Sequence, residues 1–226
     1  MENLFLEYGI KLNKEKLDKF RRYYELLVEY NQKFNITAIT EKEEVYKKHF
    51  IDSLLGVDNF IEGRLIDIGS GGGFPAIPLK IYNDNLCVTL VEATGKKCEF
   101  LKTVVDELGL KNIIVINDRA ETLIKKTGFR EGFDYCTARA VARLSTLLEY
   151  CLPFVKVGGK FVGYKGDANE EIKEARSAIK ILGGEFVKAE EKELFGAKRQ
   201  IVMIKKVSVT NPKYPRGNGK ERKNPL

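Results

Sequence analysis

Short apolar runs alternate with amphipathic segments over residues 64–205 of this chain of 226 residues. Seven runs have the length and composition of buried strands: 65–68, 86–91, 113–116, 133–137, 160–164, 186–189 and 200–205. The stretches 95–110 and 168–184 have helical spacing. This alternation predicts an α/β fold, a mostly parallel sheet with helices on both faces. The short connection between the last two runs predicts that they pair antiparallel.

Residues 1–60 are predicted to be helical. Apolar side chains recur at steps of three and four after Leu17, and we expect them to form the buried face of one helix: Phe20, Tyr24, Leu27, Val28 and Phe34. Asn13 is the expected N-cap of this helix. The segment 34–40 interrupts the helical period and predicts a connector, and a second short helix is expected over 41–56.

The composition, 43% hydrophobic and 31% charged, is typical of a globular protein with a full core. We expect three regions: a helical region over 1–60, an α/β core over 61–207 and a basic tail over 208–226. No apolar run is long enough to cross a bilayer, and the N-terminal stretch lacks the pattern of a signal peptide. We therefore expect a cytoplasmic protein, most simply a monomer, that does not bind membranes.

The cysteines are too widely spaced for a zinc site. They lie at Cys87, Cys98, Cys136 and Cys151, with no C-x-x-C pair, and the single histidine, His49, is distant from all of them. We expect no metal, and four reduced thiols that pack as small apolar side chains.

Lysine and arginine exceed aspartate and glutamate by 39 to 32, a net charge of +7. The segment 211–226 holds five basic residues and one acid, and its prolines and glycines predict an irregular conformation. Such a tail can bind the phosphates of a nucleic acid without being folded into a core, or can simply increase solubility. Both interpretations remain open at this point.

The stretch "LIDIGSGGGFPAIPL" (65–79) is a strand followed by a glycine-rich turn. Phe74 occupies the position where a dinucleotide fingerprint has its third small residue, which disfavours a pyrophosphate, and no Gly-Lys-Ser/Thr of a P-loop follows. Asp67 lies within the strand. We expect its carboxylate to hold the glycine loop through backbone N–H groups and to face a cationic ligand, although a purely turn-stabilising acid is the simpler alternative.

Acids also end the next two predicted strands. Glu92 lies about 20 residues after the turn, where a carboxylate accepts hydrogen bonds from ribose hydroxyls. Asp118 and Glu121 are both candidate acceptors for an adenine amine, and the backbone of Ala120 is a candidate partner for the adenine ring. Together with the glycines, these acids predict a site for a nucleoside cofactor. Arg139 ends the fourth strand and is expected at the rim of the same cleft.

Asp-x-Gly-x-Gly-x-Gly followed by a strand-end acid resembles the first motifs of class I S-adenosylmethionine methyltransferases. The closer resemblance is to the GidB/RsmG-type proteins, whose segments occur here in order: "FNITAI", "HFIDSL", "LIDIGSGGGFPAIPL", "VEATGKKCEFL", "RAE", "ARAVARL", "LPFVKVGGKFVGYKG" and "KYPR…KNPL". The resemblance implies a Rossmann-like class I methyltransferase fold with a seven-stranded sheet and a small N-terminal helical extension. It also implies S-adenosylmethionine as cofactor and methylation of N7 of a guanine in 16S rRNA of the small ribosomal subunit.

The resemblance further implies which residues bind the cofactor: Gly69, Gly71, Phe74, Glu92, Ala93, Thr94, Ala120, Glu121 and Arg139. Glu92, Ala93 and Thr94 would lie on the ribose side. Ala120 and Glu121 would surround the adenine, and Arg139 would lie near the transferred methyl group. Four basic residues are expected to contact RNA: Lys165, Arg199, Lys213 and Arg216.

Guanine N7 has a lone pair and no proton to lose, so this chemistry needs no general base. We accordingly predict no catalytic acid, base or nucleophile, and we expect Cys136, inside an apolar strand, not to act as one. His49 either contacts RNA at the mouth of the cleft or packs within a helix. Two other functions stay open: methylation of a protein or small molecule, and a non-catalytic RNA-binding role in ribosome assembly.

Overall fold

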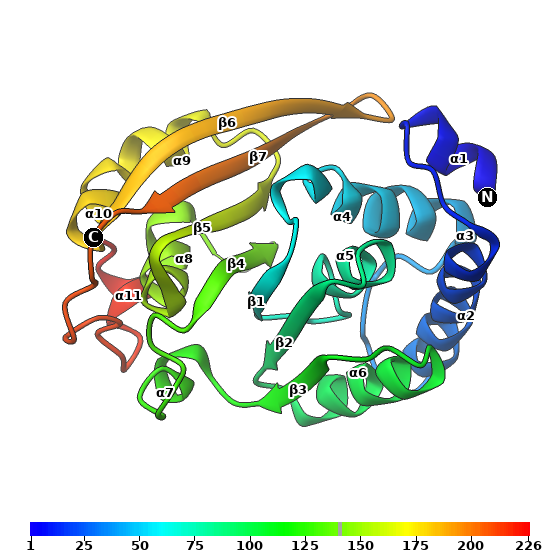
Figure 1. Ribbon diagram of the computed structural model, residues 1–226, viewed down its shortest axis with the longest axis horizontal. Helices are drawn as coiled ribbons and strands as arrows, with labels where there is room; N and C mark the ends of the chain where they lie inside the picture. Colours follow the sequence, from blue (N-terminus) through cyan, green and yellow to red (C-terminus); the bar gives the residue numbers. More distant parts are fainter. Residues whose placement is uncertain (140–141) are drawn as a thin grey trace.

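The computed structural model describes residues 1–139 and 142–226, and within them one seven-stranded sheet has the order β3-β2-β1-β4-β5-β7-β6 (Figure 1). The strands are β1 (Gly63–Ile68), β2 (Leu86–Glu92), β3 (Ile113–Asn117), β4 (Phe133–Arg139), β5 (Val155–Lys165), β6 (Gly184–Leu194) and β7 (Ala197–Lys206). Strands β1 to β5 pair in parallel, and β7 runs antiparallel to both β5 and β6. All seven predicted strands and the antiparallel final pair are confirmed.

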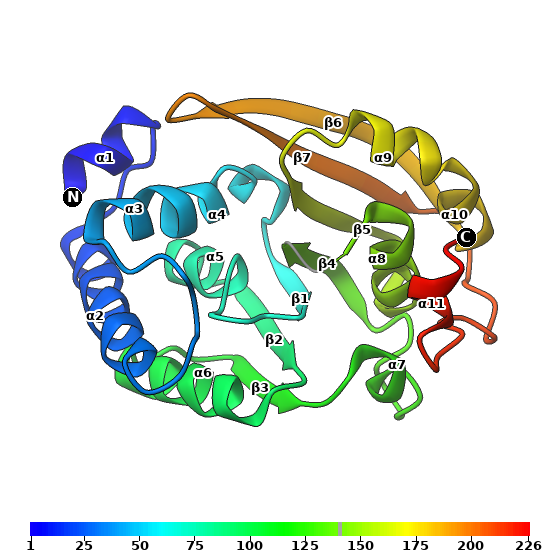
Figure 2. The same cartoon turned by 180° about the vertical axis from the view of Figure 1, so that it is seen from behind.

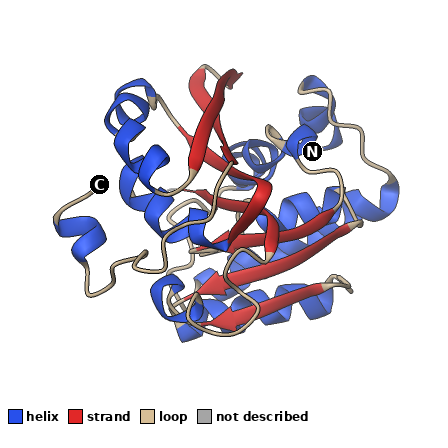
Figure 3. Cartoon of the chain, turned by 60° about the vertical axis from the view of Figure 1, so that its left-hand side comes forward, coloured by secondary structure: helices blue, strands red, loops and turns tan. Residues whose placement is uncertain are grey.

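Helices cover both faces of the sheet, as the alternating pattern predicts (Figures 1 and 3). On one face lie α1 (Glu2–Glu7), α2 (Lys14–Asn31), α3 (Lys42–Val45), a π-helix (Tyr46–Ile51), α4 (Asp52–Leu54), a 3₁₀ turn (Val57–Asn59), α5 (Ala76–Tyr82) and α6 (Gly95–Glu107). On the other lie α7 (Ala120–Leu123), α8 (Leu144–Cys151), a 3₁₀ turn (Leu152–Phe154), α9 (Asn169–Glu174), α10 (Arg176–Ile181) and α11 (Lys220–Lys223). Two hydrophobic clusters, one on each face, form the core. None of the described helices is long and apolar enough to cross a membrane.

Helix α2 begins where the sequence predicts, because the Asn13 side chain accepts a hydrogen bond from Lys16 N at 2.9 Å. The predicted buried face was partly wrong. Phe20 and Leu27 are buried, but the other buried side chains of the helix are Tyr23 and Leu26, which lie one step round from the predicted positions. Amphipathic spacing alone did not distinguish Tyr23 from the half-buried Tyr24, because both are aromatic; the contacts of Tyr23 with the core decided it.

The predicted helix over 41–56 contains a π-helical segment at Tyr46–Ile51 between α3 and α4. Such wide turns are rare and occur often at functional sites. This π-helix contains His49, and Asp52 is the first residue after its end. The helical stretch predicted over 168–184 is interrupted at Ala175, which ends α9 and precedes α10.

The basic tail is packed on the core, contrary to the expectation of an irregular segment outside it. Tyr214 and Glu221 are buried, and Thr146 Oγ1 in α8 donates to Glu221 O at 2.9 Å. Figure 2 shows α11 lying beside α8. Composition could not reveal this docking, because it depends on residues of α8 about 70 positions earlier in the chain.

Candidate active site

The glycine loop connects β1 to α5 and is held mainly by β2. Gly69 N and Ser70 N donate to Val91 O at 2.9 and 3.0 Å, and Gly71 N donates to Glu92 Oε2 at 2.9 Å. Gly69, Gly71 and Gly73 all have positive φ, at 73°, 56° and 93°. These angles explain the alternating glycines, since other residues rarely adopt them.

Tyr23 of α2 supports the loop from the opposite side. Its hydroxyl donates a short hydrogen bond to Gly72 O, and its ring stacks on Phe74 with centroids 5.5 Å apart. A Cβ on Gly73 would come within 2.5 Å of the Tyr23 hydroxyl. The helical N-terminal region therefore helps to shape the loop, a role that the sequence did not reveal.

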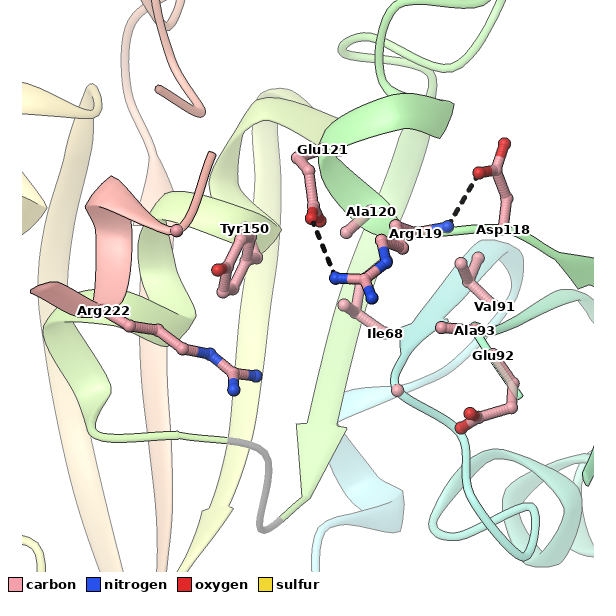
Figure 4. Close-up of a pocket in the computed structure, with 12 residues that line it drawn as sticks. Ile68, Val91, Glu92, Ala93, Asp118, Arg119, Ala120, Glu121, Tyr150 and Arg222 are labelled. Carbon is pink, nitrogen blue, oxygen red and sulfur yellow. Dashed lines mark hydrogen bonds and ion pairs between the residues drawn. The ribbon is translucent and has the colours of Figure 1, made fainter. Parts of the chain in front are cut away.

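A cavity of about 360 Å³, here called the first cavity, opens beside this loop (Figure 4). It is lined by residues from the ends of β1, β2 and β3, by α7 and α8, and by the C-terminal segment: Ile68, Gly69, Val91, Glu92, Ala93, Asp118, Arg119, Ala120, Glu121, Tyr150, Gly219 and Arg222. Five of the nine residues predicted to bind a cofactor are among them. Gly71, Phe74, Thr94 and Arg139 are not.

Glu92 is the central acid of the first cavity. It is buried, and its Oε1 accepts from Thr94 N at 2.8 Å while Oε2 accepts from Gly71 N. Each carboxylate oxygen can accept two hydrogen bonds, so Glu92 can still accept from the hydroxyls of a ribose. The same carboxylate thus holds the glycine loop and the start of α6.

Asp67 does not hold the glycine loop, contrary to the sequence-based expectation. Both of its carboxylate oxygens are fully buried and have no hydrogen-bond partner among the described residues. The Ser70 hydroxyl donates instead to the backbone oxygen of Asp67. Burial raises the pKa of Asp67 from 3.8 to about 7, and the negative charge of Glu92 adds to this. A buried carboxylate of this kind is expensive in the free protein and suits a cationic partner.

The two acids considered for the adenine amine have different environments. Asp118 forms an ion pair with Lys126 at 2.8 Å and accepts from Arg119 N. Burial opposes ionisation of Asp118, but these two contacts outweigh it and lower its pKa. Glu121 is half-buried and lies 3.8 Å from Arg119, the pair marked in Figure 4. The carboxylate of Glu121 therefore has fewer close contacts than that of Asp118 and is freer to accept a hydrogen bond from a ligand.

A second cavity, of about 350 Å³, lies at the ends of β4 and β5 and is lined by cationic side chains. Asp52 is buried beneath them and binds two: Arg139 Nη1 donates to Oδ2 at 2.8 Å, and Arg199 Nε donates to Oδ1 at 2.7 Å. Lys165 lines the same cavity and is paired with Glu171 at 2.8 Å. The structure thus brings together three of the basic residues singled out in the sequence, and adds Asp52, which the sequence analysis missed.

His49 connects this cluster to the glycine loop. Its ring stacks on Phe74 with centroids 4.5 Å apart, and the guanidinium carbon of Arg139 lies 4.9 Å from the centre of the same Phe74 ring. Arg139 Nη2 and Lys48 O each lie 3.1 Å from His49 Nδ1, and Thr37 Oγ1 lies 2.8 Å from Nε2, so both ring nitrogens have polar partners. Burial, together with Arg139, lowers the pKa of His49 to about 3. His49 is therefore a neutral side chain of the cleft.

The model of the family described as "GidB: rRNA small subunit methyltransferase G" matches residues 16–202. The chain belongs to the GidB family. Curated relatives named "Ribosomal RNA small subunit methyltransferase G" include one from Clostridium botulinum, 45% identical over 229 aligned residues that cover 97% of this chain and 95% of the relative. Another, from Limosilactobacillus reuteri, is 48% identical with the same coverage. A third, from Bacillus cereus, is 45% identical and covers 100% of this chain and 97% of the relative.

Solved structures share the fold of this GidB-family chain at low sequence identity. TYW2 of M. jannaschii, solved in complex with AdoMet, has a TM-score of 0.56 at 14% identity, over 74% of this chain and 77% of that one. A SAM-dependent methyltransferase from Aquifex aeolicus has a TM-score of 0.54 at 16% identity, over 73% and 94%. Together with the sheet order, these matches confirm the predicted class I methyltransferase fold.

The two tail residues predicted to bind RNA have different surroundings in this GidB-family chain. Lys213 is exposed, and its ammonium lies 5.1 Å from the centre of the Tyr214 ring. Arg216 makes several hydrogen bonds to the fully buried Glu149, including one from Nη2 to Oε2 at 2.7 Å. Arg216 thus anchors the tail, and RNA binding by either residue stays a prediction.

Three of the four cysteines of this GidB-family chain pack in the interior as the sequence predicts, and Cys87 does not. Cys136 is fully buried in β4, and burial holds the pKa of its thiol well above its ordinary value, so it is no nucleophile. Cys98 and Cys151 are buried as well, whereas Cys87 is exposed. The described residues contain no cluster of side chains suited to a metal ion.

Proposed function

We propose that this chain uses S-adenosylmethionine to methylate N7 of a guanine in 16S rRNA of the small ribosomal subunit. The observation that carries the proposal is the buried carboxylate of Asp67 in β1, two residues before Gly69, which has no partner among the described residues. Together with Glu92 it makes this end of the sheet acidic, which suits a cationic nucleoside and not a pyrophosphate. Membership of the GidB family supports the rRNA substrate.

The residues of the first cavity fit such a cofactor by their chemistry. Glu92 offers free acceptor positions for ribose hydroxyls, and Glu121 offers a carboxylate for an adenine amine. Ala93 and Ala120 leave room for the flat rings because their side chains are small. Thr94 supports the site through its backbone N–H, which donates to Glu92.

The bound cofactor supplies a methyl group on a positively charged sulfur. Guanine N7 carries a lone pair and no proton, so the chain needs no general base, in keeping with a neutral His49 and an inert Cys136. What the protein contributes is alignment and electrostatics. Arg139 is well placed for this role because it joins Asp52, His49 and the face of Phe74.

The second cavity is the proposed place of the guanine nucleotide. Arg139, Arg199 and Lys165 line it, and their positive charges suit the phosphates and the acceptor edge of a guanine. Asp52 and Glu171 hold these side chains in place through ion pairs. We further propose that the enzyme is a monomer, acts in the cytoplasm and binds no metal.

Methyl-labelled cofactor offered to unmethylated small subunits, to free 16S rRNA and to total cellular protein tests the proposal. We expect label in the rRNA, at a guanine that reduction and aniline treatment then cleave, because only N7-methylguanine is labile in this way. Label confined to protein would overturn the rRNA substrate. Binding of rRNA with no label in any of the three would favour an assembly factor instead.

A further inference from the structure

The C-terminal segment 214–223 forms one wall of the first cavity. Gly219 and Arg222 line it together with Tyr150 of α8, opposite the strand ends that carry Glu92 and Ala93 (Figure 4). The sequence predicts a basic tail outside the α/β core that either binds RNA or increases solubility. Its place in the structure indicates a second role, which rests on the proposed function.

Several contacts dock the segment on the core. The fully buried Glu149 of α8 accepts from the backbone N and from Nε of Arg216, both at 2.9 Å. Arg130 Nη2 donates to Tyr214 O at 2.7 Å, and the Tyr214 side chain is buried. Glu221 is fully buried and accepts a short hydrogen bond from Gly217 N. The contacts reach both ends of the segment, so its path over the cavity is specified.

Arg222 lies on the cavity side of this docked segment. Figure 4 shows its side chain extending from α11 into the cavity, near Tyr150. The side chain is exposed, and its guanidinium lies within hydrogen-bonding range of the Tyr150 hydroxyl. Glu121, Asp118 and Arg119 line the same cavity. A planar guanidinium placed in this way can stack on an aromatic ring or donate to its nitrogen atoms.

We propose that Arg222 contacts the adenosine part of the cofactor and that cofactor binding and docking of segment 214–223 are coupled. A ligand that touches the docked segment binds the docked state more tightly than the undocked one. The ligand therefore shifts the equilibrium toward docking, and loss of docking must lower the affinity for the ligand by the same factor. The C-terminal segment is then part of the cofactor site.

Titration calorimetry with S-adenosylhomocysteine, the product whose sulfur carries no charge, tests the contact without any methyl transfer. We expect Arg222→Ala to weaken binding about tenfold and Arg222→Lys to weaken it less, because lysine keeps the charge and loses the planar group. Lys223→Ala is the matched control, since this neighbour in α11 is exposed and does not line the cavity. Equal affinity of Arg222→Ala and wild type would overturn the contact.

Hydrogen exchange of the wild-type chain tests the coupling with no substitution. We expect saturating S-adenosylhomocysteine to slow exchange of the backbone amides of residues 217–223, relative to the free protein. Unchanged exchange in this segment, with slower exchange in the glycine loop, would overturn the coupling while the proposed function stands. If the wild-type chain fails to bind S-adenosylhomocysteine at all, the proposed function and this inference are both wrong.

Discussion

Arg139, the last residue of β4, donates from Nη1 to the buried carboxylate of Asp52 at 2.8 Å. The other oxygen of Asp52 accepts from Arg199 of β7 at 2.7 Å. One acid of the N-terminal helical region therefore sets the position of two cations that belong to different strands of the sheet. The second cavity has its present charge arrangement because of this acid.

We expect Asp52→Ala to leave both arginines without their acceptor. Removal of one member of a buried ion pair costs several kcal/mol, but Arg139 and Arg199 are partly exposed, so we expect a loss of about 1–3 kcal/mol in the free energy of unfolding. Urea denaturation measures this loss. Methylation of rRNA should fall far more than affinity for S-adenosylhomocysteine, because Asp52 lines only the second cavity.

Asp58→Ala is a suitable control for Asp52, since Asp58 is exposed and lies only six positions further along the chain. Its stability and activity should match those of the wild type. A variant Asp52→Ala with full methylation activity would show that the ion pairs do not position the arginines for the reaction.

Glu92→Ala should weaken binding of S-adenosylhomocysteine by about 10- to 100-fold. The substitution removes the acceptor for Gly71 N and Thr94 N together with the acceptor positions proposed for ribose. Calorimetry gives the affinity, and Glu99→Ala on the exposed side of α6 serves as the comparison. Unchanged affinity would remove Glu92 from the site.

Asp67→Asn should stabilise the ligand-free protein at alkaline pH while it weakens cofactor binding. Burial raises the pKa of Asp67 from 3.8 to about 7, so between these values the folded protein holds a proton that the unfolded chain has lost. The contribution of Asp67 to the free energy of unfolding therefore falls as pH rises from about 4 to 7 and stays low above that. Asparagine carries no charge, so we expect a gain of roughly 1–4 kcal/mol at pH 8 relative to wild type.

Urea denaturation of wild type and Asp67→Asn at pH 5 and pH 8 measures this difference. The gain should be clearly smaller at pH 5, where Asp67 in the folded wild type is protonated. A difference that is the same at both pH values would mean that Asp67 does not titrate between pH 5 and pH 8, and would contradict a pKa near 7.

His49 should remain neutral in the folded protein at any pH used for the assay. Burial and the charge of Arg139 lower its pKa to about 3. Because this is the only histidine of the chain, its ring resonances in a proton–carbon NMR spectrum are easily assigned. We expect no shift between pH 8 and pH 5, and a titration midpoint near 6.5 would contradict the buried arrangement.

Lys213 and Lys220 are two of the three exposed lysines of the tail, and we expect both to contact phosphate. The double variant Lys213→Gln and Lys220→Gln should bind rRNA more weakly, and the slope of log affinity against log salt should fall by roughly 1–2. Arg216 is left intact because it anchors the tail to Glu149. Substitution of exposed Lys102 and Lys111 by glutamine is the control, and an unaltered slope in the tail variant would favour a merely solubilising tail.

The local pattern of residues was sufficient to predict the strands of the sheet and the glycine turn. Each strand is a short apolar run, the conformation of the loop follows from glycines at alternate positions, and Asn13 caps α2 through a contact three residues away. Pro75 and Pro78 fall at the N-cap and in the first turn of α5, where a missing N–H costs nothing. These features depend on neighbours in the sequence, so the sequence reveals them.

The roles of Asp67 and Glu92 depended on the tertiary structure. Asp67 and Glu92 are both acids of adjacent parallel strands, and sequence-based reasoning gave the loop contact to Asp67. The structure gives it to Glu92, because the last residue of β2 reaches the loop while Asp67 points into the fully buried interior. Strand periodicity does not specify such distances.

The longest-range contacts were invisible in the sequence for the same reason. Asp52 and Arg199 are separated by 147 positions, and Thr146 and Glu221 by 75. Short-range pattern predicts elements, and the family resemblance predicts the cofactor and substrate. Only the folded chain decides that the N-terminal helices arrange the arginines and that the C-terminal segment forms a wall of the first cavity. Both depend on buried groups that meet partners far away in the sequence.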